Sequence, residues 1–81
     1  MEEVRVSIKE IYIPQKHRDG VNPETVAEIA ESILEQGQKT PIQVRQGKGR
    51  LVLVTGKHRL QACKDLGEEE ITAIFVGARR Y

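Results

Sequence analysis

The sequence has almost no cysteine and no long apolar segment. Its single cysteine, Cys63, cannot form an intrachain disulfide and leaves no C-x-x-C pair for zinc, which fits a reducing compartment. No apolar run exceeds four residues, far too short to cross a membrane. The N-terminal residues carry alternating charges and lack the apolar segment of a signal peptide. We therefore predict a cytoplasmic protein with no membrane partner and no metal site encoded in its sequence.

Aromatic residues and net charge are also scarce. There are two tyrosines, one phenylalanine and no tryptophan, so the core must be aliphatic. A formal net charge of +1 argues against strong non-specific binding of nucleic acid, although a local basic site is still compatible with it. A length of 81 residues predicts one domain, residues 1–81, with one small core.

The first half of the chain reads as a strand followed by a helix. Val4, Val6 and Ile8 alternate with polar residues, and the pattern resumes after a shift before Pro14 ends it. Residues 14–22 read as a polar loop. Asn22 and Pro23 are typical of a helix start and Gly37 of a helix end, which predicts a helix between them. Its expected apolar face contains Val26, Ile29, Ala30, Ile33 and Leu34.

The second half reads as a hairpin, a helix and a strand. Residues 42–45 and 50–55 form the hairpin around a glycine-rich turn, and residues 51–54 are apolar enough for burial on both faces. A helix over residues 57–66 buries Leu60, Cys63 and Leu66, and a last strand covers residues 71–76. The residues 78–81 form a short basic tail. This order predicts an α+β domain with a mixed sheet and two or three helices.

The junction Thr55-Gly56-Lys57-His58-Arg59 is the strongest candidate for a binding site. Gly56 permits a sharp turn and close approach of a ligand, and the first N–H groups of the following helix lack partners within the helix. Those N–H groups attract anions, whereas cations at a helix start cost about 0.3–1 kcal/mol. Basic residues here therefore favour a bound phosphate, although a solvated basic helix start would explain them equally well.

Two other segments offer anion-binding groups. The segment "GQKTP", residues 37–41, supplies Lys39, the hydroxyl of Thr40 and loop amides. The loop before the first helix supplies His17 and Arg18. Taken alone, each is better explained as an ordinary polar connection.

These segments together resemble the ParB/sulfiredoxin family over nearly the whole chain. ParB N-terminal domains have a strand ending in Ile-Pro, an arginine in the next loop, a "G-x-x-Q-P-I-x-V" segment and a "G-E-R-R-x-R-A" helix start. The corresponding segments here are Ile13-Pro14, Arg18, "GQKTPIQV" and "GKHRLQA". The resemblance implies a ParB/sulfiredoxin-like fold and a nucleoside triphosphate ligand, CTP or ATP, accompanied by magnesium. The implied phosphate- or nucleotide-binding residues are Arg18, Gly37, Lys39, Thr40, Pro41, Thr55, Gly56, Lys57, His58 and Arg59.

The departures from the family pattern restrict the function. Sulfiredoxins have G-C-H-R at this turn, and Lys57 stands at the position of their catalytic cysteine. We therefore do not expect this chain to reduce sulfinic acids. The amino-acid kinases of the family carry an acid where this chain has Thr55, and no acid occurs between Glu35 and Asp65. The ParB clamp helix and the DNA-reading helix-turn-helix are not in this sequence. The catalytic residues are therefore unknown.

Three functions remain open. The first is a stand-alone nucleotide- or phosphate-binding domain with weak NTPase activity at most. The second is a ParB-like nuclease or DNA-binding protein that uses the same basic residues, although no carboxylate pair suits two metals. The third is a non-catalytic regulatory domain that binds a protein partner through the glutamate-rich face of helix 22–36.

Overall fold

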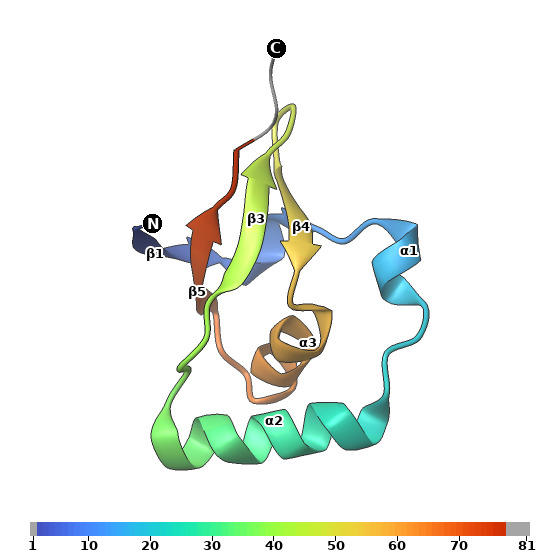
Figure 1. Cartoon of the computed structure of the whole chain (residues 1–81), viewed down its shortest axis with the longest axis vertical. Helices are drawn as coiled ribbons and strands as arrows, with labels where there is room; N and C mark the ends of the chain where they lie inside the picture. The colour runs from blue at the N-terminus through green and yellow to red at the C-terminus, as the bar shows by residue number, and fades with distance from the viewer. Residues whose placement is uncertain (1, 78–81) are drawn as a thin grey trace.

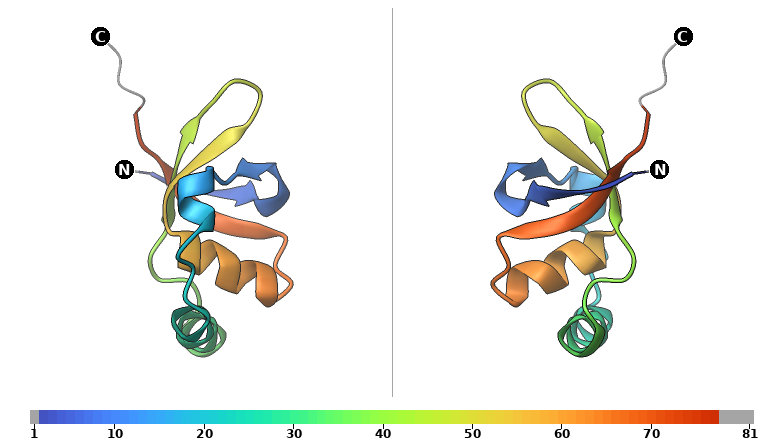
Figure 2. Two further views of the ribbon diagram at one scale, coloured as in Figure 1. Left: turned by 90° about the vertical axis from the view of Figure 1, so that its right-hand side faces the viewer. Right: turned by 90° about the vertical axis from the view of Figure 1, so that its left-hand side faces the viewer.

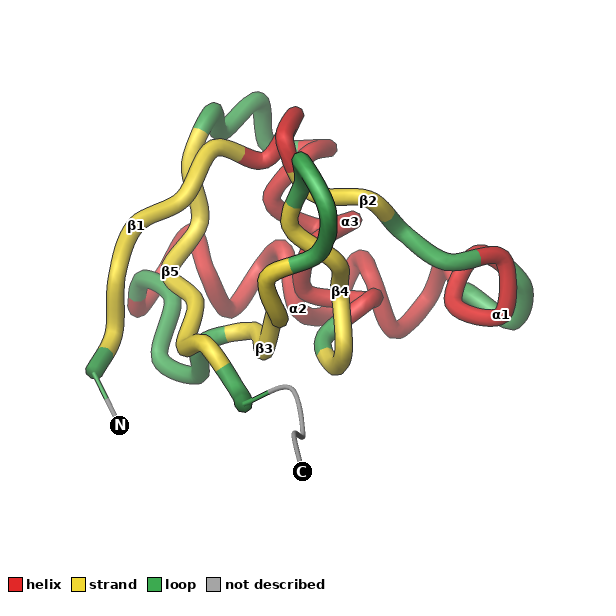
Figure 3. Tube along the Cα trace, turned by 90° about the horizontal axis from the view of Figure 1, so that it is seen from above, coloured by secondary structure: helices red, strands yellow, loops and turns green. Residues whose placement is uncertain are grey.

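A five-stranded mixed sheet organises the chain. The computed structural model describes residues 2–77, so the tail 78–81 lies outside the described residues. The strands are β1 (Glu3–Ser7), β2 (Ile11–Tyr12), β3 (Ile42–Gln46), β4 (Leu51–Thr55) and β5 (Glu70–Phe75). They lie in the order β1-β5-β3-β4-β2, as Figures 1 and 3 show. The predicted α+β class with a mixed sheet is confirmed.

The strand pairing alternates in direction across the sheet. β1 pairs antiparallel with β5, and β5 pairs parallel with β3. β3 and β4 form the predicted antiparallel hairpin, and the two-residue β2 pairs parallel with β4 at the edge. The first strand signal therefore divides into two strands on opposite edges of the sheet. A 3-10 turn, η1 (Ile8–Glu10), makes the crossing between them.

Two longer helices lie to one side of the sheet. α3 (Lys57–Asp65) lies between the sheet and α2 (Pro23–Gln36), and a short helix, α1 (Gln15–Arg18), stands beside β2 and β4 (Figures 1 and 2). α1 corrects the prediction of a polar loop over residues 14–22. It is one turn long and buries no residue, so it leaves no apolar periodicity in the sequence.

The core is aliphatic, as predicted, and lies between the sheet and α3. Its fully buried side chains come from four elements. Cys63 belongs to the same cluster, which confirms its prediction as a core residue. The largest fully buried side chains are Ile42, Leu53, Leu60, Ile71 and Val44.

Two burial predictions are wrong. Leu34 was expected on the apolar face of α2 but is 73% exposed, because it lies about 100° around the helix from Ile33. Residues 51–54 were expected to be buried on both faces, but Leu51 and Val54 are only half-buried. On the face of β4 opposite α3, Val52 is buried but Val54 is only half-buried, because α1 covers that face only in part.

Candidate functional site

Gly56 shapes the start of α3. Its backbone has φ 111°, a left-handed conformation that side chains rarely adopt. A Cβ atom at this position would lie 2.6 Å from Cγ2 of Ile42, well inside contact distance. The turn from β4 into α3 therefore requires glycine, both for its conformation and for its packing on β3.

The first turn of α3 has no cap. No side chain among residues 2–77 accepts a hydrogen bond from its N–H groups, and no acidic residue lies in that turn. By contrast, the side chain of Asn22 accepts hydrogen bonds from the N–H groups of Glu24 and Thr25 at the start of α2. The helix dipole and the free N–H groups thus leave the α3 start electropositive.

A cavity of about 390 Å³ opens between the α1 segment and α3. We call it the basic cavity. Arg18 and Lys57, both predicted site residues, line it, together with His17 and Lys64. None of its lining residues in the described chain is a carboxylate. The full lining is Ile11, Tyr12, Ile13, His17, Arg18, Val21, Lys57, Gln61 and Lys64.

Main-chain carbonyl groups hold the two cations in place. Nζ of Lys57 donates to the carbonyl oxygen of Asp19 at 3.1 Å, and Nε of Arg18 donates to that of Ile13 at 2.8 Å. The contact of Lys57 joins the α1 segment to α3, and neither contact neutralises a charge. Among residues 2–77 a single salt bridge is present, and it joins Arg5 to Glu70. The cations of the basic cavity therefore have no salt bridge within that part of the chain.

The sequence prediction missed several residues of the basic cavity. Gln61 and Lys64 lie four and seven positions after Lys57, so they share its face of α3. This helical spacing could have identified both. Tyr12 and Val21 form an apolar wall and carried no comparable signal, because only the fold brings β2 and the α1 segment beside α3.

A second, smaller hollow contains the other predicted cations. Gly37, Lys39 and Arg59 line a space of about 150 Å³ beside α2, together with Ser32 and Glu28. We call it the Arg59 hollow. Lys57 and Arg59 therefore leave the first turn of α3 in different directions. The residues proposed for one phosphate pocket are divided between two sites.

The remaining residues of the segment 37–41 lie outside both cavities. Thr40 is exposed and Pro41 is half-buried, and neither lines the basic cavity or the Arg59 hollow. Thr55, at the end of β4, is exposed and lines neither. Gln38 holds the segment in place, because its side-chain amide bonds the main chain of Thr72 in both directions, at 2.8 and 2.9 Å.

His58 connects the two longer helices. Its Nε2 accepts a hydrogen bond from the main-chain N–H of Asn22 at 3.1 Å. Asn22 thus caps α2 with its side chain while its own N–H is bonded to α3. In this arrangement His58 positions α2 against α3 and contacts neither cavity.

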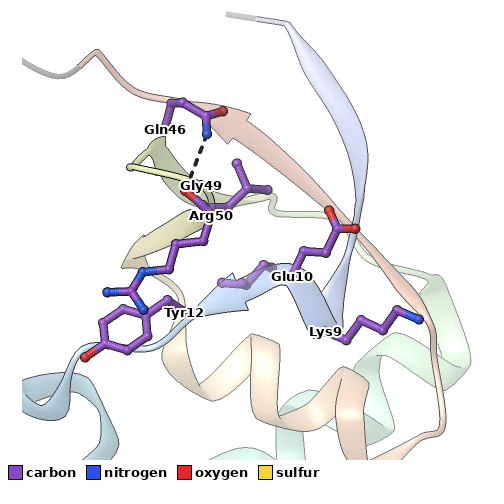
Figure 4. Close-up of a pocket in the computed structure, with 8 residues that line it drawn as sticks. Lys9, Glu10, Tyr12, Gln46, Gly49 and Arg50 are labelled. Carbon is purple, nitrogen blue, oxygen red and sulfur yellow. Dashed lines mark hydrogen bonds between the residues drawn. The ribbon is translucent and has the colours of Figure 1, made fainter.

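Tyr12 forms the boundary of the basic cavity toward the β3–β4 hairpin. The guanidinium of Arg50 lies 3.7 Å from the centre of the Tyr12 ring, as Figure 4 shows, and that of Arg18 lies at 5.7 Å. The amide of Gln46 donates to the carbonyl oxygen of Arg50 and holds the hairpin end. Cation–π contacts of this kind orient a guanidinium while leaving its N–H groups available.

Residues 2–77 contain neither a metal-binding cluster nor a membrane-spanning helix. Among residues 2–77, no group of three or more His, Cys, Asp or Glu side chains is placed to hold a metal ion. In the described part of the chain, no helix combines the length and apolarity that crossing a membrane would require.

The sequence matches known proteins of one family. The model of the ParB N-terminal domain matches residues 1–80. A probable chromosome-partitioning protein ParB from Campylobacter jejuni is 38% identical over 62 residues, covering 76% of this chain and 22% of that protein. The transcriptional repressor protein KorB from Escherichia coli is 39% identical over 59 residues, covering 69% and 16%. The chain thus spans about a fifth of the length of these relatives.

Solved structures confirm the fold. Sulfiredoxin from Arabidopsis thaliana superposes with a TM-score of 0.87 at 24% identity, covering 96% of this chain and 88% of that one. The ParB protein of Caulobacter crescentus, complexed with CTP-gamma-S, has a TM-score of 0.81 at 20% identity, covering 98% and 46%. A free serine kinase in complex with ADP has a TM-score of 0.80 at 15% identity, covering 94% and 31%. The chain belongs to the ParB N-terminal domain family and has the ParB/sulfiredoxin-like fold.

Proposed function

We propose that this ParB N-terminal domain binds a nucleoside triphosphate, with its phosphate groups at the uncapped start of α3. The observation that carries the proposal is the basic cavity, where His17, Arg18, Lys57 and Lys64 gather without a carboxylate among the lining residues of the described chain. Like charges in one cavity repel one another, and a polyphosphate would relieve that repulsion. The ParB protein complexed with CTP-gamma-S and the kinase complexed with ADP share this fold, which supports the proposal.

The side chains of the site suit different parts of a nucleotide. The ammonium of Lys57 acts as a point charge, and Arg18 and Arg59 offer planar forks to phosphate oxygens. The apolar wall of Tyr12 and Val21 suits a base or sugar. Because Lys57 and Arg59 leave the helix start on different sides, we place the phosphates over the first turn of α3, between the basic cavity and the Arg59 hollow. Gly37 and Lys39 then contribute from the side of the hollow.

The residues of the basic cavity do not fit a magnesium ion held by the protein. Magnesium prefers oxygen ligands, usually carboxylates, and the described lining residues supply none. A magnesium ion would therefore arrive bound to the nucleotide. Hydrolysis also requires a group that orients or deprotonates water. We accordingly propose binding without efficient turnover, and the weak NTPase activity stays a prediction.

Calorimetric titration with CTP, ATP and GTP, with and without magnesium, tests the proposal. Arg59→Ala removes a cation beside the first turn of α3 whose side chain makes no hydrogen bond among residues 2–77. It should weaken nucleotide binding about tenfold, the worth of one charge-assisted hydrogen bond. Lys48→Ala, in the β3–β4 turn, removes the same charge away from the cavity and should leave binding unchanged. Absence of binding at millimolar nucleotide, or equal effects of the two variants, would refute the proposal.

DNA binding is the second candidate, favoured by the sequence similarity to a transcriptional repressor. The same cations would then contact the phosphate backbone, and affinity would fall steeply with salt. Nuclease activity is less well supported, because no metal-binding group lies among the described residues. A gel-shift titration on duplex and single-stranded DNA at two salt concentrations distinguishes this candidate from nucleotide binding. A regulatory protein partner and the cytoplasmic location stay predictions.

A further inference from the structure

Leu34 forms an apolar projection with acidic neighbours. Leu34 is 73% exposed. On α2 it lies between the buried face and the side that carries Glu24, Glu28, Glu31 and Glu35. Glu31 lies three positions before Leu34, and Glu35 lies one position after it. Both glutamates are exposed. Neither carboxylate has a salt bridge among residues 2–77, because the one pair found there joins Arg5 and Glu70.

The sheet carries a groove of the opposite character. A cavity of about 660 Å³ lies between α1 and the face of β3 and β4 that points away from α3. We call it the sheet groove. Val54 and Val76, both half-buried, form its accessible apolar part, and Val52 is buried beneath them with 7% of its surface exposed. The cations Lys16 and Arg45 and the imidazole of His17 also line it, and no carboxylate does so in the described chain.

The register of the hairpin explains why this groove is open. Val44 pairs with Leu53, and both are fully buried toward α3. Arg45 pairs with Val52 on the other face, where neither α2 nor α3 packs. Pleating places Val54 on the same side as Val52, next to that arginine. The groove therefore combines apolar side chains with positive charge.

We infer that Leu34 of one copy inserts into the sheet groove of a second copy, so that the domain self-associates head to tail. The apolar projection matches the valines, and its flanking glutamates match the cations around the groove. Within one molecule α3 separates α2 from the sheet, so Leu34 cannot reach its own groove (Figures 1 and 2). The two surfaces differ, which makes the contact heterologous and capable of repeating along a chain of copies.

Such a contact is small, so the association should be weak and depend on concentration. The charges around the groove should affect mainly the rate of encounter and its salt dependence. Sedimentation equilibrium over about 10 µM to 1 mM protein should show growth beyond the dimer, which added salt weakens.

Two variants test the contact from its two sides. Leu34→Asp removes the projection and keeps the groove, whereas Arg45→Glu reverses a charge of the groove and keeps the projection. Both side chains are exposed, so the fold should be retained, as circular dichroism would verify. Each variant alone should weaken association about tenfold or more. Mixed together, they should form a one-to-one dimer that does not grow further.

A matched control and two contrary outcomes complete the test. Gln36→Asp adds the same charge as Leu34→Asp at an exposed position on another side of α2, and should associate like the wild type. A wild type that remains monomeric throughout refutes the inference. If Arg45→Glu associates like the wild type while Leu34→Asp does not, then α2 pairs with α2, and the sheet groove is not the partner surface.

Discussion

Gly56 satisfies two independent constraints at the point where the strand β4 becomes the helix α3. Its φ of 111° is unfavourable for any residue with a Cβ atom, and the space a Cβ would need is occupied by Ile42. Gly67, just after α3, also has a positive φ, 80°, but nothing lies within 4 Å of its missing Cβ. The pair therefore separates backbone strain from steric overlap.

Gly56→Ala should destabilise the domain by about 3 kcal/mol, since left-handed strain and overpacking add together. Gly67→Ala, the matched control, should cost about 1 kcal/mol from backbone strain alone. Urea denaturation followed by circular dichroism measures both. Equal losses in the two variants would show that Ile42 moves aside without cost, and the packing explanation would be wrong.

Among the elements, α2 depends most on its ends. Val26 is its one buried residue in the described chain, and the helix is held by contacts with α3 and by its N-terminal cap. The side chain of Asn22 bonds two N–H groups of the first turn, and its own N–H bonds His58. The same residue thus begins α2 and attaches it to α3.

Asn22→Ala should therefore cost about 1 kcal/mol, the usual worth of a helix cap. In a domain of this size that loss lowers the melting temperature by roughly 4–8 °C. Asn22→Ser restores a capping oxygen and should recover most of the stability, which thermal denaturation would show. A serine variant as unstable as the alanine variant would assign the effect to something other than the cap.

The elements also show what the sequence could reveal. α2 was predicted at both ends because Asn22, Pro23 and Gly37 act locally: Asn22 caps the first turn with its side chain, and Pro23 and Gly37 act through their own backbone. α1 was not, since one turn without buried residues has no periodicity. In the candidate site, Gly56 and Lys57 were identifiable from the chemistry of a helix start. Tyr12 was not, because it reaches the basic cavity only through the pairing of β2 with β4.

The distribution of the predicted cations could not be deduced either. Lys57 and Arg59 are two residues apart, which on a helix means different faces. Which face meets α1 and which meets α2 depends on how α3 packs, and that depends on Leu60 and Cys63 in the core. Local sequence therefore predicted which residues carry charge but not which cavity each would enter.

For the whole molecule, the core connects stability to pH through Cys63. The thiol is 3% exposed, and burial, with a further contribution from the charge of Glu68, raises its pKa. Below the ordinary thiol pKa both folded and unfolded states keep the proton. Above it the unfolded chain releases its proton first, so stability falls as pH rises toward the raised folded pKa.

The free energy of unfolding should accordingly fall by up to about 1.4 kcal/mol per pH unit in that alkaline window. Urea denaturation in steps from about pH 7 to about pH 10 measures the slope. Cys63→Ala is the control, because it keeps the other titrating groups and should show a shallower slope, whatever its absolute stability. Parallel slopes in the two proteins would mean that the thiol does not control alkaline stability.

The pairing of β5 has a consequence for the order of folding. β5 is the last strand in the described part of the chain, yet it lies inside the sheet between β1 and β3, and Glu3 pairs with Ile74. Contacts between such distant residues close a long loop and slow folding. During synthesis, β1 has no hydrogen-bonding partner in the sheet until β5 has left the ribosome. Nascent chains shorter than about 75 residues should therefore remain unfolded, and the domain completes its sheet only after its final strand is made.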